Sequence, residues 1–568
     1  MLRLDNVCKI YPHGEVLKEV SWEVKPGSRI GLVGANGSGK TTQFKIICGH
    51  EEPTSGQVVR AQGLKIGYLC QEFDLVPTNT VAEEFMRAFV ELNEIQGQLD
   101  RVHKAMETAQ DKELNRLIRE MDDLQRQFEA KGGYTTDAKI EKMLVSMGFG
   151  AEGGKRLVRE FSGGWQMRMN LGKVLLREPD VLLLDEPTNH IDLETIEWLE
   201  SFLVSNSTPL VMVSHDRHFL DRLCTSIVEM ERGTATQYLG NYTQYVEARA
   251  LNRDAQLAAF ERQSREMEKQ QAFVDRFRAS ATRSTQAKSR EKQLDKIELV
   301  DKPDTEERTL EFHFPQAVRS GMEVATIKNL THAYGDNVIF LDANLHITRG
   351  DRIAILGPNG SGKSTLLRIL TGAEPALSGQ AALGAHNVKM AYFEQNQAEA
   401  LDLTKSVLDT IYDEVPEWKT DEVRGLLGRF LFSGDAVFKN VATLSGGEKA
   451  RLALAKMLLG ANNFLILDEP TNHLDIPAKE TLEAALKKFD GTVVVVSHDR
   501  YFIQEVANKI VEIKDGQLVL YHGNYHYYLE RKEKERLKEE EKRLAAEKAE
   551  KDAQKRAQRL AKEKGRKA

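Results

Sequence analysis

Two glycine-rich segments of this chain have the residue types and spacing of phosphate-binding loops. The first runs from Gly34 to Thr41 and the second from Gly357 to Ser364, and both fit the pattern G-x-x-x-x-G-K-[ST]. Glycines let backbone N–H groups close around phosphates, the lysine reaches the β- and γ-phosphate oxygens, and the Thr or Ser hydroxyl binds Mg²⁺. The two segments therefore predict two sites for ATP and Mg²⁺.

The residues expected to contact ATP form two matching sets. In the first loop they are Gly34, Asn36, Gly37, Ser38, Gly39, Lys40, Thr41 and Thr42. In the second loop they are Gly357, Asn359, Gly360, Ser361, Gly362, Lys363, Ser364 and Thr365. A tyrosine lies 29 residues before each lysine, at Tyr11 and Tyr334, and its π face can stack on adenine.

Two pairs of adjacent acidic residues could support hydrolysis. Asp185 and Asp468 each follow a continuous apolar run that predicts a buried parallel strand. We expect each aspartate to hold Mg²⁺, together with the hydroxyl that ends the phosphate loop. The next residue, Glu186 or Glu469, can polarise the water that attacks the γ-phosphate.

Histidine and glutamine residues also recur at matched positions. His215 and His498 each follow the glutamate by 29 residues, within Ser-His-Asp, and can meet the γ-phosphate. Three adjacent residues cannot adopt the geometry of a serine-protease triad, so that chemistry is excluded. Gln71 and Gln395 lie 31 and 32 residues after the lysines. They can sense Mg²⁺ and the attacking water.

A Ser-Gly-Gly segment lies 23 residues before each aspartate and precedes a predicted helix. The two segments are Ser162, Gly163, Gly164 and Ser445, Gly446, Gly447. Their N–H groups and the positive helix N-terminus suit an anion. Because each module's own loop already binds phosphates, a second anion site has a use if it faces the other module's ATP.

The repeated spacings define two modules, roughly residues 1–240 and 321–530. Apolar strands alternate with helical stretches, which is typical of the α/β class with ligands at the carboxyl ends of the strands. The first module carries about 41 extra residues near 88–131. Their apolar residues follow a helical period and predict two antiparallel helices: Leu114, Ile118, Met121, Leu124 and Phe128. A longer surface insertion without a partner is the alternative.

Residues 241–320 join the modules and are expected to form a helical hairpin. Between Phe273 and Lys296 there are seven basic and three acidic residues, although the whole chain has a formal net charge of −7. This basic stretch favours contact with phosphates, and a plain spacer is the alternative. The tail, 531–568, has 16 basic and 9 acidic residues. It predicts a charged helix that is either solvated or in contact with nucleic acid.

No membrane segment is predicted. The longest apolar runs, such as Val493 to Val496, are far shorter than the about 20 residues that cross a bilayer. The N-terminus lacks the apolar core of a signal peptide. We expect a cytoplasmic protein with no membrane partner.

The combination of phosphate loop, Gln, Ser-Gly-Gly, Asp-Glu-Pro-Thr-Asn-His and Ser-His-Asp resembles the ATP-binding-cassette superfamily. Two cassettes joined by a basic helical hairpin, with no membrane domain, look like the ABC-F subfamily, and the opening half looks most like its cyanobacterial and plastid branch. The resemblance implies two tandem ABC-type P-loop ATPase domains with a helical arm insertion, a helical-hairpin linker and a charged helical tail.

The two cassettes of that family stack head to tail, so the resemblance implies a monomer with an intramolecular cassette dimer. One site would be closed by Ser445 and Gly447 and would contain Tyr11, Lys40, Thr41, Gln71, Asp185, Glu186 and His215. The other would be closed by Ser162 and Gly164 and would contain Tyr334, Lys363, Ser364, Gln395, Asp468, Glu469 and His498.

The resemblance also implies a translation factor that binds the ribosomal E site with ATP and leaves on hydrolysis. Its partners would be ribosomal RNA and the P-site tRNA, toward which the linker of family members extends. An ATPase that acts on branched DNA and the ATPase subunit of a transporter with separate membrane subunits are the alternatives. A role in antibiotic resistance is not favoured, because the linker does not resemble the long, apolar-tipped linkers associated with it.

Overall fold

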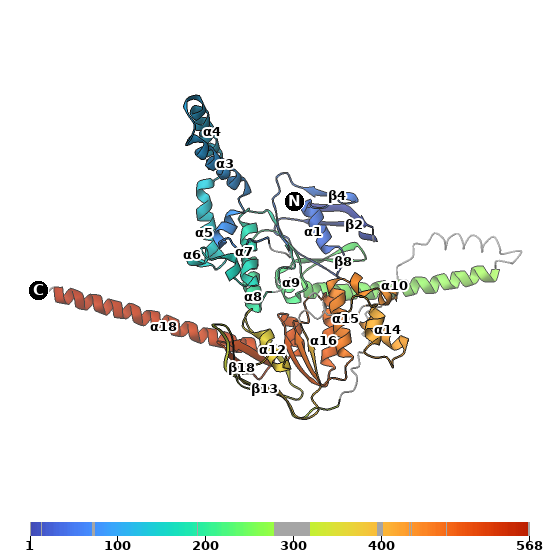
Figure 1. Cartoon of the computed structure of the whole chain (residues 1–568). Coiled ribbons are helices and arrows are strands. Elements are labelled where there is room, and N and C mark those ends of the chain that lie inside the picture. The colour runs from blue at the N-terminus through green and yellow to red at the C-terminus, as the bar shows by residue number, and fades with distance from the viewer. Residues whose placement is uncertain are drawn as a thin grey trace. The chain divides into compact units, whose positions relative to one another are not determined.

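The structure is a computed structural model of the chain. It describes residues 2–12, 14–70, 74–189, 191–277, 318–394, 401–430, 432, 434–472 and 474–565. The chain divides into two compact units, Met1–Phe312 with Leu474–Thr481, and His313–His473 with Leu482–Ala568. Each unit contains a six-stranded sheet and a three-stranded sheet (Figure 1).

The six-stranded sheet of the first unit provides the predicted strand ends. Its strands are, in order, β5 (Ile66–Leu69), β6 (Val181–Asp185), β7 (Leu210–Val213), β3 (Arg29–Gly34), β8 (Ser226–Glu231) and β9 (Thr234–Leu239). The first five are parallel, and β9 is antiparallel to β8. Leu182 and Leu184 of β6 enter one hydrophobic core, whereas Val181 and Leu183 enter another. Burial on both faces explains why this strand is an unbroken apolar run.

Helices pack on one face of this sheet, and a helix with a small antiparallel sheet packs on the other. The first layer is made of α7 (Gly163–Leu175), α8 (Leu193–Ser205) and α9 (Arg217–Leu223). The second is made of α1 (Lys40–Cys48) and the strands β2 (Gly14–Val24), β1 (Leu2–Tyr11) and β4 (Ser55–Arg60). Phe219 is fully buried in the first layer and Phe44 in the second. Burial of each such side chain contributes about 1.5–3 kcal/mol.

A helical region lies between β5 and β6 in the sequence. It contains α2 (Val81–Met86), α3 (Val90–Met106), α4 (Asp111–Ala130), η1 (Gly133–Thr135), α5 (Thr136–Ser146), α6 (Gly150–Gly153) and η2 (Val158–Glu160). The two long helices α3 and α4 form a hairpin that extends away from the sheets of the first unit (Figure 1). This hairpin occupies the predicted insertion.

The predicted apolar face of the hairpin was wrong at one position. Ile118 is 37% exposed, whereas its neighbour Leu117 is buried. Leu117 packs with Leu124 of the same helix and with α3 residues such as Val102. Spacings of four, three and four residues from Leu117 onward place the buried side chains on the α3-facing side, so position 118 turns toward solvent.

The second unit repeats this architecture. Its six-stranded sheet has the order β14 (Met390–Phe393), β15 (Phe464–Asp468), β16 (Thr492–Val496), β12 (Arg352–Leu356), β17 (Lys509–Lys514) and β18 (Gln517–Tyr521). Its small sheet contains β11 (Asn337–Thr348), β10 (Glu323–Tyr334) and β13 (Ser378–Leu383). The helices are α12 (Lys363–Thr371), α13 (Val407–Tyr412), α14 (Thr420–Arg429), α15 (Gly446–Leu458) and α17 (Arg500–Val506), with η4 (Gly434–Phe438), η5 (Val441–Thr443) and the part of α16 (Ile476–Lys487) that follows Thr481. Between β14 and α15, the part that the structure describes contains no counterpart of the α3–α4 hairpin.

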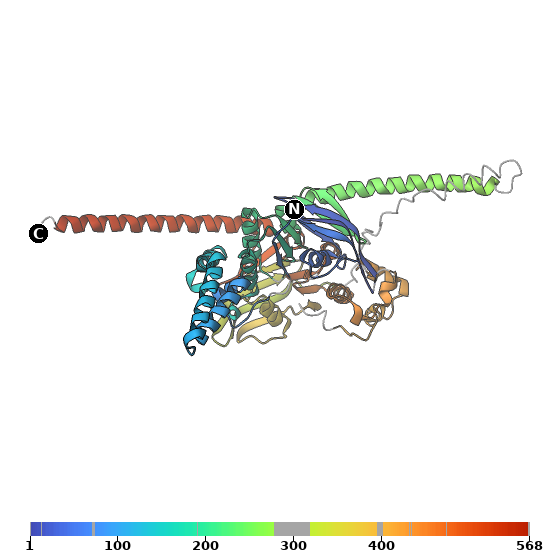
Figure 2. The same ribbon diagram turned by 90° about the horizontal axis from the view of Figure 1, so that it is seen from above.

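A long helix leaves each unit next to its antiparallel edge strand. The helix α10 (Tyr242–Phe277) follows β9, and α18 (Tyr525–Gly565) follows β18 (Figure 2). At the root of α10, buried Glu229 accepts a hydrogen bond from the Tyr245 hydroxyl at 2.9 Å and pairs with Arg249 at 2.6 Å.

The root of α18 has the same construction. Buried Glu512 accepts hydrogen bonds from the hydroxyls of Tyr521 at 3.0 Å and Tyr528 at 3.3 Å, and pairs with Lys532 at 2.5 Å. Each long helix is therefore fixed to its own sheet through a buried carboxylate. The predicted returning helix of the linker, and most of its basic stretch, lie in residues 278–317, outside the described residues.

The predicted α/β class with two tandem modules is confirmed. The antiparallel strands β9 and β18 and the two small sheets were not predicted, because the search for buried strands used continuous apolar runs. In β1, β2, β10 and β11 exposed positions interrupt the buried ones, and β4, β9, β13 and β18 contain no fully buried residue. Within the described part of the chain, no helix combines the length and the apolar character needed to cross a membrane.

Candidate functional site

Each predicted phosphate loop joins a central strand to a helix, β3 to α1 and β12 to α12. Gly37 and Gly39 have φ angles of 82° and 91°, and Gly360 and Gly362 have 83° and 95°, in the left-handed region that glycine adopts without strain. A Cβ on Gly39 would lie 2.6 Å from the Leu17 side chain. Both conformation and space therefore require glycine in these loops.

The loop lysines are held inside their own loops. Lys40 Nζ donates hydrogen bonds to the carbonyls of Gly34 and Ala35 at 2.8 and 2.9 Å. Lys363 Nζ makes the equivalent bonds to Gly357 and Pro358 at 2.9 and 3.0 Å. Both lysines are buried, and burial lowers the pKa of Lys40. A phosphate group could replace these carbonyls as the acceptor and would favour the charged amine.

Two loop hydroxyls indicate that the loops suit a phosphate. Ser38 Oγ and Ser361 Oγ are buried, and neither has a hydrogen-bond partner among the described residues. A buried hydroxyl without a partner is costly, and phosphate oxygens would supply the missing acceptors. The glycine backbone, the lysine and this hydroxyl together fit the triphosphate of ATP.

The predicted Mg²⁺ carboxylates lie beside the loop hydroxyls. Thr41 Oγ1 lies 3.4 Å from Asp185 Oδ1, and the Ser364 hydroxyl donates to Asp468. Burial raises the pKa of Asp185, and raises that of Asp468 to about 6. Among the described residues, no group of three His, Cys, Asp or Glu side chains could hold a metal. One carboxylate and one hydroxyl fit Mg²⁺, which usually takes its other ligands from phosphate and water.

A tyrosine that sequence reasoning missed holds the first of these carboxylates. The Tyr68 hydroxyl donates to Asp185 Oδ2 at 3.1 Å. Its counterpart Tyr392 is near Asp468, but its buried hydroxyl has no hydrogen-bond partner in the described part of the chain. Both tyrosines lie three residues before the predicted glutamine. This repeated spacing was a signal that the search could have used.

The two predicted catalytic glutamates have an unusual backbone conformation. Glu186 has a φ angle of 50° and Glu469 of 49°, in the left-handed region that residues other than glycine rarely adopt. Such strain persists where the surrounding structure fixes it, often at functional sites. The N–H of Glu186 donates to the Val213 carbonyl, and that of Glu469 to the Val496 carbonyl, both at 2.9 Å. Each glutamate is therefore tied to the end of the neighbouring strand.

The predicted histidines lie directly against these glutamates. The His215 N–H donates to Glu186 Oε2 at 3.3 Å, and His215 Nε2 lies 3.3 Å from Oε1. His498 and Glu469 have the same two distances. His215 Nε2 also lies 3.2 Å from Asn36 Oδ1 of the phosphate loop. The histidine thus joins the glutamate to the loop in the first module.

Burial tunes the protonation of this pair. It raises the pKa of Glu186 to about 7 and lowers the pKa of His215 well below its ordinary value. His215 is therefore neutral at pH 7 and can donate or accept one hydrogen bond through Nε2. Glu186, whose pKa lies near neutrality, has the proton affinity of a general base.

The predicted adenine-stacking tyrosines lie beside the first turn of the loop helices. The Tyr11 hydroxyl interacts with Glu51 and with the Thr42 side chain. The Tyr334 hydroxyl lies 3.3 Å from Thr365 Oγ1. The structure thus brings each tyrosine to its own phosphate loop, and its stacking on adenine remains a prediction.

The two Ser-Gly-Gly segments begin helices, as predicted, but with different caps. Ser445 caps α15 through a reciprocal capping box with Glu448, whose N–H donates to Ser445 Oγ at 3.3 Å. Ser162 begins α7 without a side-chain cap bond, and Trp165, which stands where Glu448 stands in the other module, cannot supply the reciprocal bond of a capping box. Anion binding by Ser162, Gly163, Gly164, Ser445, Gly446 and Gly447 remains a prediction. Gln71 and Gln395 lie outside the described residues.

Comparisons with known proteins agree with this site. A family model described as "ABC transporter" matches residues 17–189 and 340–472, and an extension model with the same description matches 228–314. The chain is 49% identical over 544 residues to ABC transporter F family member 5 of Arabidopsis thaliana, covering 95% of this chain and 78% of the relative. It is 48% identical over 544 residues to ABC transporter F family member 2 of the same plant, covering 95% and 80%.

A solved structure shows the same fold at lower identity. It contains an archaeal ribosome recycling factor, aABCE1, in complex with ribosomal stalk protein aP1. The match has a TM-score of 0.56 and 19% identity, and covers 90% of this chain and 89% of that chain. Two phosphate loops with their Asp-Glu pairs, the matches to the cassette model and the close plant relatives lead to one conclusion: the chain belongs to the ABC-F family and is an ATPase.

Proposed function

We propose that this ATPase binds the ribosome in its ATP-bound state, leaves on hydrolysis, and thereby regulates or rescues translation. The observation that carries the proposal is the α3–α4 hairpin, which extends from the first module of an ABC-F chain and has no counterpart in the described part of the second (Figure 1). The described part of the second module carries matching ATP-site residues without such a hairpin, so a partner explains the hairpin better.

Two solved structures of this fold contain ribosome-associated proteins. One contains an archaeal ribosome recycling factor, and another is a model of ribosome-bound archaeal Pelota and ABCE1. At 19% identity these matches show the fold alone. The finer proposal, binding at the E site with the linker toward P-site tRNA, rests on ABC-F membership. A cytoplasmic location likewise stays a prediction.

Each module would use the same chemistry. A water oxygen forms a bond to the γ-phosphorus while the bond from that phosphorus to the β,γ-bridging oxygen breaks, giving ADP and phosphate. Glu186 or Glu469 takes up the proton of the water, and the neighbouring histidine holds the carboxylate by the contacts described above. Lys40 or Lys363 stabilises the phosphate charge. Mg²⁺ on Asp185 or Asp468 would neutralise the β- and γ-phosphate oxygens.

Charge suggests two different contacts with the ribosome. The basic stretch between Phe273 and Lys296 suits RNA phosphates. The hairpin from Val90 to Ala130 carries ten acidic and six basic residues, so it suits a cationic protein surface better than RNA. A ribosome offers both kinds of surface, whereas naked branched DNA offers only phosphates.

Co-sedimentation with 70S ribosomes tests the proposal. The form used is Glu186→Gln with Glu469→Gln, which should keep ATP bound because both loop lysines remain. We expect ATP-dependent binding that weakens with salt. Neutralising Arg276, Arg278, Arg283, Lys288 and Arg290 should make the negative slope of log affinity against log salt shallower by about 3–5.

Removal of the hairpin, residues 91–130, should weaken ribosome binding without making that slope shallower, because no phosphate contact is lost. The matched control is a branched DNA junction. ATP should not increase its binding to the protein, either with or without the hairpin. Absence of ATP-dependent ribosome binding would contradict the proposal. Strong junction-DNA binding in its place would favour the branched-DNA alternative.

A further inference from the structure

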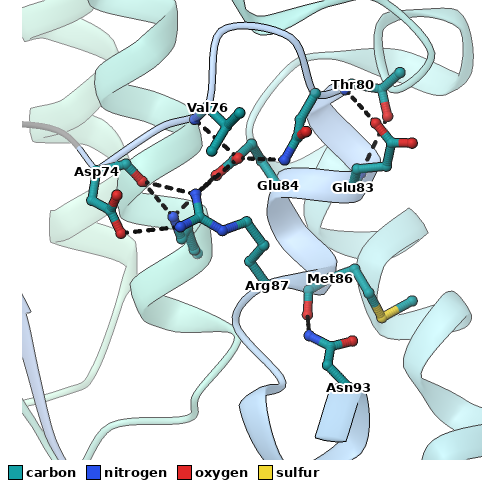
Figure 3. A network of polar contacts seen from close by, with 10 residues as sticks. Asp74, Val76, Thr80, Glu83, Glu84, Met86, Arg87 and Asn93 are labelled. Carbon is teal, nitrogen blue, oxygen red and sulfur yellow. Dashed lines mark hydrogen bonds and ion pairs between the residues drawn. The ribbon is translucent and has the colours of Figure 1, made fainter. Parts of the chain in front are cut away.

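A cluster of four charged residues lies at the base of the α3–α4 hairpin; Glu84 and Lys173 are buried, Arg87 is half-buried and Asp74 is exposed. We call Asp74, Glu84, Arg87 and Lys173 the polar lock (Figure 3). Glu84 is fully buried, and its carboxylate accepts bonds from Arg87 Nη1 and Lys173 Nζ, each at 3.0 Å. Two positive and two negative charges balance. None of these residues belongs to the ATP sites described above.

The lock also fixes the backbone that follows β5. Lys173 Nζ donates to the Asp74 carbonyl at 2.6 Å, and the Val76 N–H donates to Glu84 Oε1 at 3.1 Å. Asn79 Nδ2 donates to the same oxygen at 2.9 Å. The segment 74–79 is therefore bound through both backbone and side-chain atoms.

One side of the lock is α7, whose N-cap is the predicted anion-binding Ser162. We call α7 and its counterpart α15, the two helices that begin at the Ser-Gly-Gly segments, the signature helices. Lys173 lies in the last turn of this helix. Next to it, Gly172 allows very close packing, because a Cβ there would lie 2.8 Å from the ring of buried Phe85 on α2. Both the ion pair and the packing therefore join α2 to α7 as one rigid joint.

The other side of the lock is the root of the hairpin. Arg87 is the C-terminal cap of α2, three residues before α3 begins at Val90. Asn93 Nδ2, in the first turn of α3, donates to the Met86 carbonyl at 2.9 Å (Figure 3). Arg87 Nη2 reaches Asp74 Oδ2 at 3.3 Å. A continuous set of polar contacts thus leads from α3 to α7.

The second module provides an internal comparison without a hairpin. Its helix α13 corresponds to α2, since Thr80 bridges Leu157 as Ser406 bridges Asn440. In this register Glu84 is replaced by Thr410, whose hydroxyl only bonds the Ser406 carbonyl at 2.8 Å.

The second module also lacks the lock's contacts at the positions of Arg87 and Lys173. Asp413 stands in place of Arg87. Lys456 stands in place of Lys173, and it pairs with Glu414 at 3.1 Å on the surface, where both side chains are 42% exposed. The lock therefore occurs in the module that carries the hairpin and is absent from the described part of the other.

The arrangement favours positioning over simple stability. Buried ion pairs often stabilise a fold less than apolar residues of the same size would, but they fix one geometry because a displaced partner leaves a charge unpaired. An apolar contact between α2 and α7 already exists around Phe85. The ion pairs of the lock in addition fix the orientation of α2 relative to α7.

We propose that the polar lock couples the α3–α4 hairpin to the signature helix α7, and that Glu84 and Lys173 are positioning residues through which the hairpin affects ATP turnover. This coupling goes beyond ribosome binding and does not depend on it. With the lock intact, the hairpin holds the start of α7 in place. Without the lock, the hairpin and α7 act independently.

A double-mutant cycle on the full chain, without ribosomes, tests the coupling. The first change replaces residues 91–130 by a short Gly-Ser linker. The two ends can be joined, since Lys131 contacts the Glu91 carboxylate. The second is Glu84→Gln with Lys173→Met, which removes the ion pair without leaving one buried charge alone. Turnover is measured as kcat and KM per ATP-binding-competent molecule, together with the thermal midpoint.

We expect each change alone to lower kcat at least about twofold, the lower end of coupling between contacting groups. Combined, they should lower kcat no further, while their effects on the thermal midpoint add. If the combined variant loses kcat by the product of the two single losses, the proposal is overturned. It is also overturned if the hairpin deletion leaves kcat unchanged. Lys173→Arg keeps the charge and the donors and should restore the wild-type response.

A matched pair on the surface serves as the control. Lys139 and Glu178 are joined at 2.7 Å in the same unit and are both exposed. In Lys139→Met with Glu178→Gln, the hairpin deletion should lower kcat as it does in the wild type. If the buried double variant fails to fold, Arg87→Met decides the question, because it leaves the Glu84–Lys173 pair intact and cuts only the hairpin side. An unchanged effect of the deletion in that variant would overturn the proposal.

Discussion

At the scale of single residues, the strongest functional signal is a glutamate in a conformation that glutamate avoids. Glu186 and Glu469 hold left-handed φ angles in both modules, and a histidine contacts each carboxylate. In both modules this strained glutamate lies against a histidine beside the phosphate loop, which favours a functional role. This backbone conformation places the Glu186 carboxylate directly after the end of β6 and the Glu469 carboxylate directly after the end of β15.

The first prediction concerns these carboxylates. Glu186→Gln with Glu469→Gln should lower ATP turnover by about 10²–10⁴-fold, because the general base is lost in both sites. The affinity for ATP should stay within a few-fold of the wild type, since Lys40 and Lys363 remain. Steady-state turnover and equilibrium nucleotide binding measure the two quantities separately. A double variant that hydrolyses ATP at the wild-type rate would show that another group activates the water.

The second prediction separates two tyrosines that look equivalent in the sequence. Tyr68→Phe removes the hydrogen bond to Asp185 and should raise the Mg²⁺ concentration for half-maximal turnover about tenfold, as expected for loss of a group that orients a metal ligand. Tyr392→Phe is the control, because among the described residues its hydroxyl has no partner to lose. Equal effects of both changes on the Mg²⁺ requirement would contradict the assignment of Tyr68.

At the scale of elements, the two signature helices differ in how they begin. Ser445→Ala should lower the free energy of unfolding by about 1 kcal/mol, because it removes the side-chain cap of α15. Ser162→Ala should cost clearly less, since α7 has no such bond. Chemical denaturation of the two variants measures the difference. A larger loss for Ser162→Ala would mean that its side chain stabilises the fold in another way.

The lock at the base of the hairpin should respond to acid. Burial raises the pKa of Glu84, but bonds from Lys173, Val76 and Arg87 outweigh burial and hold the pKa below its ordinary value of 4.5. The folded state therefore binds this proton less tightly than the unfolded state. The lock contributes fully to the free energy of unfolding above pH 4.5. This contribution is lost as the pH falls through the lower folded-state pKa of Glu84.

Stability measured against pH checks this sign. The free energy of unfolding of the wild type should fall more steeply below pH 4.5 than that of Glu84→Gln with Lys173→Met, so the two curves should converge in acid. Curves that stay parallel from pH 7 to pH 3 would show that Glu84 is not held as a carboxylate by the lock.

Sequence reasoning succeeded for elements whose burial leaves a simple pattern. Continuous apolar runs predicted β6 and β15, because strands buried on both faces leave no polar position. It failed at Ile118, because adjacent apolar residues on a helix differ by only 100° and the period alone cannot choose between them. It could not find the left-handed φ of Glu186, which depends on the neighbouring strand. The lock was also missed, because Glu84 and Lys173 are 89 residues apart.

At the scale of the whole molecule, the two modules share one set of site residues but differ in their attachments. The hairpin and the lock belong to the first module, whereas each module anchors a long helix. From Glu533 to Ala545 every residue of α18 is exposed, so between Tyr525 and Ala545 only the first turns of this helix pack on its sheet.

Truncation of the tail should therefore have two outcomes. Ending the chain after Lys532 should change the thermal midpoint little, because Glu512 keeps its contacts with Tyr528 and Lys532. Ending it after Asn524 should lower the midpoint by several degrees, because Glu512 loses Tyr528 and Lys532 and retains a buried charge. Thermal unfolding of both truncated chains distinguishes these cases. An equal loss in both would mean that the outer part of α18 packs elsewhere.

The matching roots of α10 and α18 carry information about ancestry. Five residues of one root lie 283 positions before their equivalents in the other: Glu229, Tyr238, Tyr242, Tyr245 and Arg249, matched by Glu512, Tyr521, Tyr525, Tyr528 and Lys532. The gene segment that was duplicated thus encoded a cassette together with the start of its exit helix. By this match, α18 is the second copy of α10, the first helix of the linker. The hairpin and the lock, found in one copy, mark where the two descendants diverged.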